Sequence, residues 1–154
     1  VMLYARTKAS AAKFSKLIQE GQLVKEYVAL VHGTPPSAGD WEDLLWKDST
    51  KNKVFAVKRM RGGGKKARLE FTRLTGGDTS QVRIRLHTGR SHQIRVQFSS
   101  RGMPLWGDGK YGSRVKGDLT LFSCGLGFPH PKTGKPMEFD AKPTGEMWEM
   151  INEL

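Results

Sequence analysis

Cysteine is almost absent from this sequence, in which Cys124 is the single one among 154 residues. A lone cysteine excludes an internal disulfide and cannot complete a structural zinc site. We also expect no metal site because no ligand spacing on any one element joins the four histidines, His32, His87, His92 and His130. Cys124 lies in the apolar run 119–128, where we expect it to pack as a small buried group in a protein of the reducing cytoplasm.

Long apolar runs are also missing. No stretch approaches the roughly 18 apolar residues of a membrane-spanning helix, and no charged and then apolar signal segment opens the chain. These absences predict a soluble, intracellular protein without a membrane partner. We also expect it to be a monomer. The chain begins at Val1 inside the run VMLYA, which we expect to form a strand and to belong to a longer protein.

Acidic side chains are scarce, with 15 Asp and Glu against 26 Lys and Arg and a net charge of +11. A positive charge of this size indicates a polyanionic partner, and nucleic acid is the first candidate. The alternative is a basic surface that serves only solubility.

The hydrophobic patterns predict one α+β domain over residues 1–154. Apolar spacing predicts helices over 8–20, over 91–101 with Ser91 as N-cap and Gly102 as terminator, and from 144 onward with Met147, Trp148 and Ile151 on its apolar face. Alternation predicts strands over 22–33, 54–59, 67–74, 81–87 and 119–124, and a hairpin about 131–136. Because glycine-rich turns join the strands, we expect a mixed, largely antiparallel sheet with flanking helices.

The run QVRIRLHTGRSHQIR concentrates positive charge at one turn. Alternation predicts one buried face (Val82, Ile84, Leu86) and one open face (Arg83, Arg85, His87). Arg90 follows the Thr88-Gly89 turn, at a junction between strand and helix that favours anions. Together with His92 and Arg95 it is suited to phosphate or to a bidentate carboxylate. The alternative is a solvated basic helix face.

Two other features carry open interpretations. Tyr27 is either a half-buried sheet residue or a ring that stacks on a base and offers a hydroxyl for proton transfer. The segment RMRGGGKK lacks the ending of a phosphate-binding P-loop, so we interpret Arg61 to Lys66 as a flexible basic hairpin tip that can contact a phosphate backbone.

The sequence resembles three successive signatures of the RluA family of RNA pseudouridine synthases. They are KEYVALVHG, then LHTGRSHQIRVQF with GMPLWGDGKYG after it, and then FPHPKTGKPMEF. The opening VMLYARTKASAAKFSKLI resembles the strand and helix that follow the family's first motif. The resemblance implies the pseudouridine synthase catalytic fold and the isomerisation of specific uridines in ribosomal or transfer RNA, with no cofactor.

The resemblance also implies roles for two residues. Tyr27 matches the tyrosine that stacks on the target base, and Arg90 matches the arginine that pairs with a nucleophilic aspartate. That aspartate belongs to an HRLD-type motif, which these 154 residues do not contain. Asp40 and Asp108 lie in turns that do not match it. We therefore expect a catalytic domain without its N-terminal portion, inactive as written; the alternative is an RNA-binding module of the same fold without catalysis.

We expect the RNA to lie in a basic cleft between the sheet and the helix that follows Arg90. The residues predicted to contact it are Lys25, Arg61, Lys65, Lys66, Arg83, Arg85, His92 and Arg95.

Overall fold

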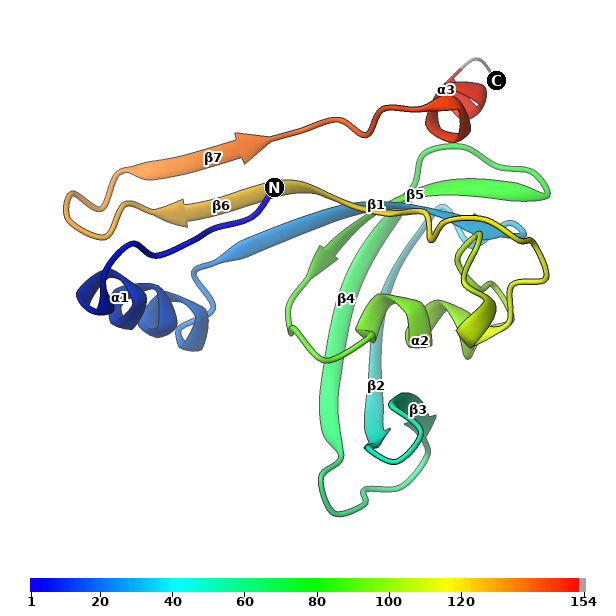
Figure 1. Cartoon of the computed structure of the whole chain (residues 1–154), viewed down its shortest axis with the longest axis horizontal. Helices are drawn as coiled ribbons and strands as arrows, with labels where there is room; N and C mark the ends of the chain where they lie inside the picture. The colour runs from blue at the N-terminus through cyan, green and yellow to red at the C-terminus, as the bar shows by residue number, and fades with distance from the viewer. Residues whose placement is uncertain (153–154) are drawn as a thin grey trace.

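The computed structural model describes the backbone of residues 1–152 and the side chains of residues 1–149. Its strands form one antiparallel sheet in the order β3-β2-β4-β5-β1-β6-β7 (Figure 1). The strands are β1 (Val24–His32), β2 (Ala38–Asp48), β3 (Lys53–Val57), β4 (Lys65–Arg73), β5 (Thr79–Leu86), β6 (Leu121–Pro129) and β7 (Pro136–Asp140). The helices are α1 (Lys8–Gln19), α2 (Gln93–Ser99), α3 (Glu146–Asn152) and the short 3-10 helix η1 (Gly109–Tyr111).

The centre of the sheet depends on pairings between segments far apart in the sequence. β1 lies between β5 and β6, so Tyr27 faces Ile84 on one side and Ser123 on the other. An irregularity in the β1–β6 pairing falls between Glu26 and Tyr27. The middle of β1 is therefore fixed by strands that follow it by more than fifty residues.

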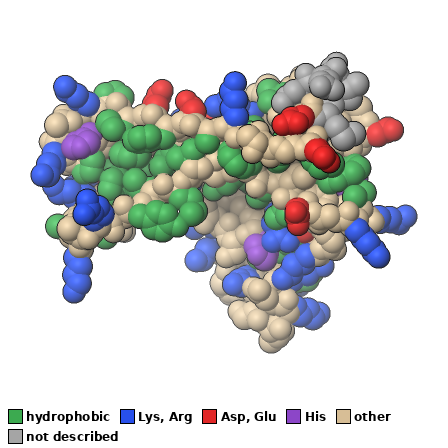
Figure 2. Space-filling view, turned by 45° about the horizontal axis from the view of Figure 1, so that its top comes forward, with side chains coloured by type: hydrophobic (Ala, Val, Ile, Leu, Met, Phe, Trp, Pro, Cys, Tyr) green, Lys and Arg blue, Asp and Glu red, His purple; other side chains and the backbone are tan. Residues whose placement is uncertain are grey.

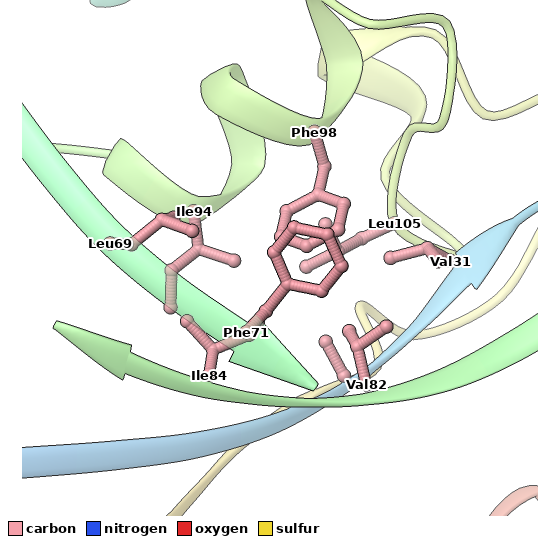
Figure 3. Close-up of a cluster of buried hydrophobic side chains, with 9 residues drawn as sticks. Val31, Leu69, Phe71, Val82, Ile84, Ile94, Phe98 and Leu105 are labelled. Carbon is pink, nitrogen blue, oxygen red and sulfur yellow. The ribbon is translucent and has the colours of Figure 1, made fainter. Parts of the chain in front are cut away.

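Helix α2 covers one face of the sheet (Figure 3). Ile94 and Phe98 of α2 pack on Phe71, Val82 and Ile84 of the sheet, and Phe98 is fully buried. This is the predicted i, i+4 face of the helix on the predicted apolar face of β5. The expected α+β class and largely antiparallel sheet are confirmed.

Helix α1 forms as predicted but buries none of its residues. Thr7 and Ser10 form a capping box at its start, which satisfies the first free amide groups. The helix contacts the sheet through Phe14, whose ring meets that of Phe128 of β6 edge-on with the ring centres 5.2 Å apart. Hydrophobic side chains gather at this end of the molecule, over α1 and the β6–β7 hairpin (Figure 2).

Three expectations about local structure were wrong. Residues 1–5 form no strand: Val1 hydrogen-bonds to Ser123, but Met2 and Tyr4 are 73% and 77% exposed.

The second error is that the strand β2 was not predicted. Its inward-facing row includes the charged Asp43 between Trp41 and Leu45, which obscures the alternation.

The third error concerns the start of α2. Ser91 does not cap this helix; His92 occupies the cap position with a left-handed φ of 51° and without a side-chain cap. The helix ends at Ser99, and Gly102, with a φ of 76°, follows it as expected. α3 begins at Glu146, and the expected packing of Ile151 lies outside the described side chains.

No helix in the described part of the chain is long and apolar enough to cross a membrane. Cys124 is buried, as predicted, and its burial raises the pKa of the thiol.

A buried ion pair ties α2 to the loop before β6. Arg95 donates two hydrogen bonds to Asp108, from Nε to Oδ2 at 2.7 Å and from Nη2 to Oδ1 at 2.8 Å, and its guanidinium lies 4.8 Å from the ring centre of Tyr111. Asp108 is only 2% exposed. Removing one partner of such a pair leaves an uncompensated buried charge.

We expect Asp108→Asn to lower the free energy of unfolding by about 3–5 kcal/mol, because Arg95 would keep its charge without a carboxylate. Urea unfolding followed by circular dichroism measures the change. The matched control is Asp40→Asn, which removes an exposed bidentate partner of Arg68 and should change stability little. Equal losses in the two variants would contradict the prediction.

Candidate active site

A cavity of about 310 Å³ lies where the end of α1, the start of β1 and the turn between β5 and α2 meet. Its walls come from Ile18 and Gly21, from residues 23–25 and from residues 85–90. Lys25 and Arg90, both predicted from the sequence, line it together. Arg85, which was also predicted, lines it as well, so the fold brings three of the expected site residues to one place.

The backbone of Arg90 is held by the side chain of Gln93, which is 3% exposed. Gln93 Oε1 accepts hydrogen bonds from the Arg90 amide at 3.0 Å and from the Thr88 hydroxyl at 2.8 Å. Its Nε2 donates to the carbonyl of Arg68 in β4 at 3.0 Å. The turn is thus fastened to the sheet through one buried amide.

The side chain of Arg90 is exposed and only partly engaged. Its Nε donates to the carbonyl of Lys66 at 2.8 Å, which directs the guanidinium along the start of β4. Within the described residues no carboxylate pairs with it. Its remaining N–H groups can bind a carboxylate or a phosphate in the fork geometry of arginine.

Tyr27 lies two residues beyond Lys25 on β1, so alternation places both side chains on the α2 side of the sheet. The ring is half-buried and packs against the main core. Next to it, the amino group of Val1 donates to the Ser123 carbonyl at 2.5 Å, and the Ser123 hydroxyl donates to the Val1 carbonyl at 2.9 Å. The first residue of the chain therefore lies beside the strand partner of Tyr27.

Arg83 is not brought to this cavity. It projects from the opposite face of β5 and pairs with Glu26 at 2.5 Å. Arg85 projects from the same opposite face but also lines the cavity. That face carries further cross-strand pairs, which are Asp40 with Arg68, Glu70 with His87 and Glu42 with Lys66. The Arg68 guanidinium lowers the pKa of Asp40, so this pair stays charged.

His92 and Arg95 are directed inward rather than toward the cavity. Tyr111 Oη accepts a hydrogen bond from the Val54 amide at 2.9 Å, so its own proton is free for His92 Nδ1, 2.7 Å away. Burial lowers the pKa of His92, which agrees with a neutral ring that accepts at Nδ1. The RNA contacts expected of His92 and Arg95 stay predictions, but both side chains already have internal partners.

The other predicted contacts lie at the β3–β4 connection. Lys66 offers its carbonyl to Arg90, Lys65 begins β4, and the Arg61 guanidinium lies 5.5 Å from the ring centre of Trp46. No group of three or more potential metal ligands occurs in the described part of the chain.

Sequence reasoning missed the residues that hold the turn. Gln93 and Tyr111 lie in quoted signatures, but nothing local shows that Gln93 reaches back to Thr88 and across to Arg68. The left-handed φ of His92, which directs its ring to Tyr111, is equally a product of tertiary contacts.

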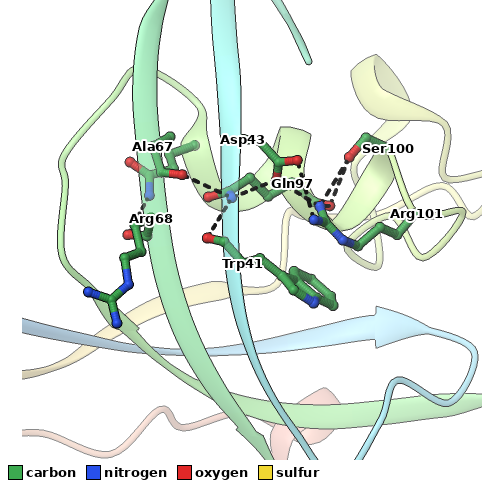
Figure 4. A network of polar contacts seen from close by, with 8 residues as sticks. Trp41, Asp43, Ala67, Arg68, Gln97, Ser100 and Arg101 are labelled. Atoms are coloured by element: carbon green, nitrogen blue, oxygen red, sulfur yellow. Dashed lines mark hydrogen bonds and ion pairs between the residues drawn. The ribbon is translucent and has the colours of Figure 1, made fainter. Parts of the chain in front are cut away.

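One turn further along α2, Gln97 anchors the helix elsewhere (Figure 4). Its Nε2 donates to Asp43 at 2.7 Å and to the Trp41 carbonyl at 3.3 Å, and Asp43 also accepts from Arg101 at 2.8 Å. Gln97 is as buried as Gln93 but makes no contact with the Arg90 turn, so it provides a matched control.

We expect Gln93→Met to release the Arg90 amide while the helix stays folded. The lost hydrogen bond should speed hydrogen exchange at this amide roughly tenfold. Exchange measured residue by residue by NMR checks it. Gln97→Met should leave the Arg90 amide unchanged, and the same rate in wild type and Gln93→Met would contradict the proposed clamp.

The lowered pKa of His92 has a consequence for stability. Because the unfolded ring has the higher pKa, near 6.5, the unfolded state binds more protons and stability falls as pH drops through that value. We expect His92→Gln to lose less stability than wild type between about pH 7.5 and 5.5. Urea unfolding at both pH values gives the difference, and an equal or larger loss in the variant would refute it.

Comparison with known proteins gives a consistent result. Residues 1–100 match the sequence profile of a family described as RNA pseudouridylate synthase. Ribosomal large subunit pseudouridine synthase D of Vibrio vulnificus is 31% identical over 171 aligned positions, covering 100% of this chain and 52% of the relative. A Bacillus subtilis protein described as uncharacterized RNA pseudouridine synthase YlyB is 36% identical over 137 positions, covering 86% of this chain and 44% of the relative.

Among solved structures, human RNA pseudouridylate synthase domain containing 1 has a similar fold. The TM-score is 0.77 at 23% identity, covering 90% of this chain and 62% of the other. The chain spans about half the length of the curated relatives that it matches.

Proposed function

This chain belongs to the RNA pseudouridylate synthase family, and on that basis we propose that its protein converts specific uridines in structured RNA to pseudouridine. The names of relatives such as ribosomal large subunit pseudouridine synthase D favour ribosomal RNA over transfer RNA as the substrate. The buried, unpaired Cys124 suits the cytoplasmic location that we also propose.

The observation that carries this proposal is the arrangement around Arg90. A buried amide and a backbone carbonyl hold this arginine in one orientation, yet its guanidinium has no carboxylate partner among the described residues. A guanidinium prepared in this way can orient an aspartate and keep it ionised. Tyr27, on the same side of the sheet, offers a ring to a base that leaves its stack and a hydroxyl for proton transfer.

The nucleophile is the missing part. No HRLD-type sequence occurs in the 154 residues. We propose that an aspartate a few residues before Val1 completes the site, because Val1 lies beside the strand partner of Tyr27. The 154 residues alone would then bind RNA without turnover.

A second candidate, an RNA-binding module without catalysis, is favoured only by this missing motif. It predicts the same fold and the same net charge, so the two candidates differ only in whether the protein catalyses pseudouridine formation. The sequence that the gene encodes before Val1 and an assay of turnover separate them.

The test uses the protein with its gene-encoded upstream residues, ribosomal and transfer RNA transcripts, and mass spectrometry of digested RNA to count pseudouridine. We expect turnover by this protein and a loss of at least about a hundredfold in Arg90→Ala. Arg90→Lys should also lose activity, because lysine cannot bind a carboxylate bidentately. Tyr27→Phe tests whether the hydroxyl matters beyond stacking.

Lys16→Ala, on the exposed face of α1, is the control and should keep wild-type turnover. Undiminished turnover in Arg90→Ala would sink the role assigned to Arg90. Absence of turnover in the wild-type protein with its upstream residues, on both classes of RNA, would favour the non-catalytic module.

A further inference from the structure

Most of the net charge of the chain lies in one short segment. Residues 44–66 contain eight of the 26 basic side chains but one of the 15 acidic ones, so they supply seven of the eleven net positive charges. The basic side chains are Lys47, Lys51, Lys53, Lys58, Arg59, Arg61, Lys65 and Lys66. We call residues 44–66 the basic hairpin; they comprise the end of β2, β3 and the start of β4.

The single acid in the basic hairpin does not neutralise its cations. Asp48 Oδ1 accepts from the Thr50 hydroxyl at 2.6 Å and from the Thr50 amide at 3.0 Å, which closes the turn between β2 and β3. Among the described residues, the one ion pair that reaches this segment joins Lys66 to Glu42, both of them exposed. The other cations of the hairpin are available to a polyanion.

The basic hairpin also carries two aromatic rings that are accessible to solvent. Leu45 and Val54 point into the second core cluster, so their neighbours Trp46 and Phe55 alternate to the other face. Trp46 and Phe55 are cross-strand partners with ring centres 6.3 Å apart. Phe55 is 37% exposed and Trp46 is partly exposed.

A cation lies over each of these rings. The Arg61 guanidinium lies 5.5 Å from the centre of the Trp46 ring, and Lys53 Nζ lies 5.7 Å from that of Phe55. Neither cation has an acidic partner in the described part of the chain. Both rings can therefore be uncovered by a rotamer change without leaving a buried charge behind.

A second tryptophan on β2, Trp41, also has an arginine over its ring, but in that contact both side chains are held by other residues. Arg101 lies 4.1 Å from the ring centre of Trp41, but it is fixed by Asp43, and Trp41 packs against the main core. Arg61 has no carboxylate partner of this kind among the described residues, and Trp46 is not among the residues that pack against the main core. A ligand can therefore displace the Arg61 guanidinium from the Trp46 ring.

We propose that Trp46 and Phe55 form a platform that binds unpaired bases of single-stranded RNA, while the surrounding cations contact the phosphates. Stacking of a base on an aromatic ring is stronger than an exposed cation–π contact, so a base displaces Arg61, which moves to a phosphate. A duplex hides the faces of its bases and can reach only the cations. The platform therefore selects single-stranded over double-stranded RNA.

The platform lies near the candidate active site, and its biological use rests on the proposed function. Lys66, whose carbonyl holds Arg90, pairs with Leu44 of β2. Trp46 lies two residues, about 7 Å, further along that strand. Alternation along β2 places the platform on the face opposite to Tyr27, so an RNA strand that contacts both must pass around the start of β4. Nucleotides that flank the target uridine can reach the platform along this path, and we infer that it holds them unpaired.

The test measures binding of the 154-residue chain to an oligouridylate of about twelve nucleotides and to a blunt RNA duplex of the same length, over a range of salt. Trp46→Leu should weaken binding of the single strand about tenfold with an unchanged salt slope, because it removes a ring and no charge. Trp46→Phe, which keeps a ring, should restore most of the affinity.

Lys58→Ala is the control that removes a charge and no ring. It should reduce the salt slope by about 0.7 and weaken single strand and duplex alike. Thermal unfolding checks that each variant is folded. Equal weakening of single strand and duplex by Trp46→Leu, no effect of that variant, or no binding of RNA at all would overturn the platform.

This experiment is independent of turnover. If the single strand binds in a Trp46-dependent way and the protein with its upstream residues makes no pseudouridine, the platform stands and the proposed function fails. If pseudouridine forms but Trp46→Leu binds like wild type, the platform fails and the proposed function stands.

Discussion

The pairing of β1 with both β5 and β6 is the constraint on which the rest of the structure depends. Both neighbours of β1 come from later parts of the chain, so the sheet cannot close until segments separated by fifty to a hundred residues have met. Such non-local pairing costs loop entropy before it brings stability. The packing of α2 depends on this pairing, because Ala29 and Val31 of β1 share one core cluster with Ile94 and Phe98 of α2.

The same pairing decides which charges can act together. Alternation along β5 divides its side chains between two faces, so Arg83 is used in an ion pair with Glu26 on the face opposite to Tyr27. Strand alternation does not determine the direction of Arg90, because this residue follows β5 in a turn whose backbone is hydrogen-bonded to Gln93. Cations that are close together in the sequence are thus separated in space. Only some of them line the cavity at the end of α1 that forms the candidate site.

How far the sequence predicted this arrangement depended on how local each signal was. β5 and the buried face of α2 were predictable because Val82, Ile84, Ile94 and Phe98 follow the periods of a strand and a helix. β2 was not, because Asp43 faces inward where Gln97 and Arg101 satisfy it, and those partners lie more than fifty residues away. The start of α2 at His92 and the inward direction of Arg95 had the same cause: Tyr111 and Asp108 determine them from another loop.

Family likeness and charge therefore point to different parts of the molecule. The signatures direct attention to Arg90 and Tyr27, to which the proposed function assigns roles, whereas most of the net charge lies in the basic hairpin, outside the quoted signatures. A cation beside a reacting group must be fixed, as Gln93 and the Lys66 carbonyl fix Arg90. A cation that only attracts a phosphate backbone gains from freedom to follow it, as the weakly held Arg61 can. The two kinds of positive charge meet at the start of β4, where the carbonyl of one residue of the basic hairpin orients the guanidinium of Arg90.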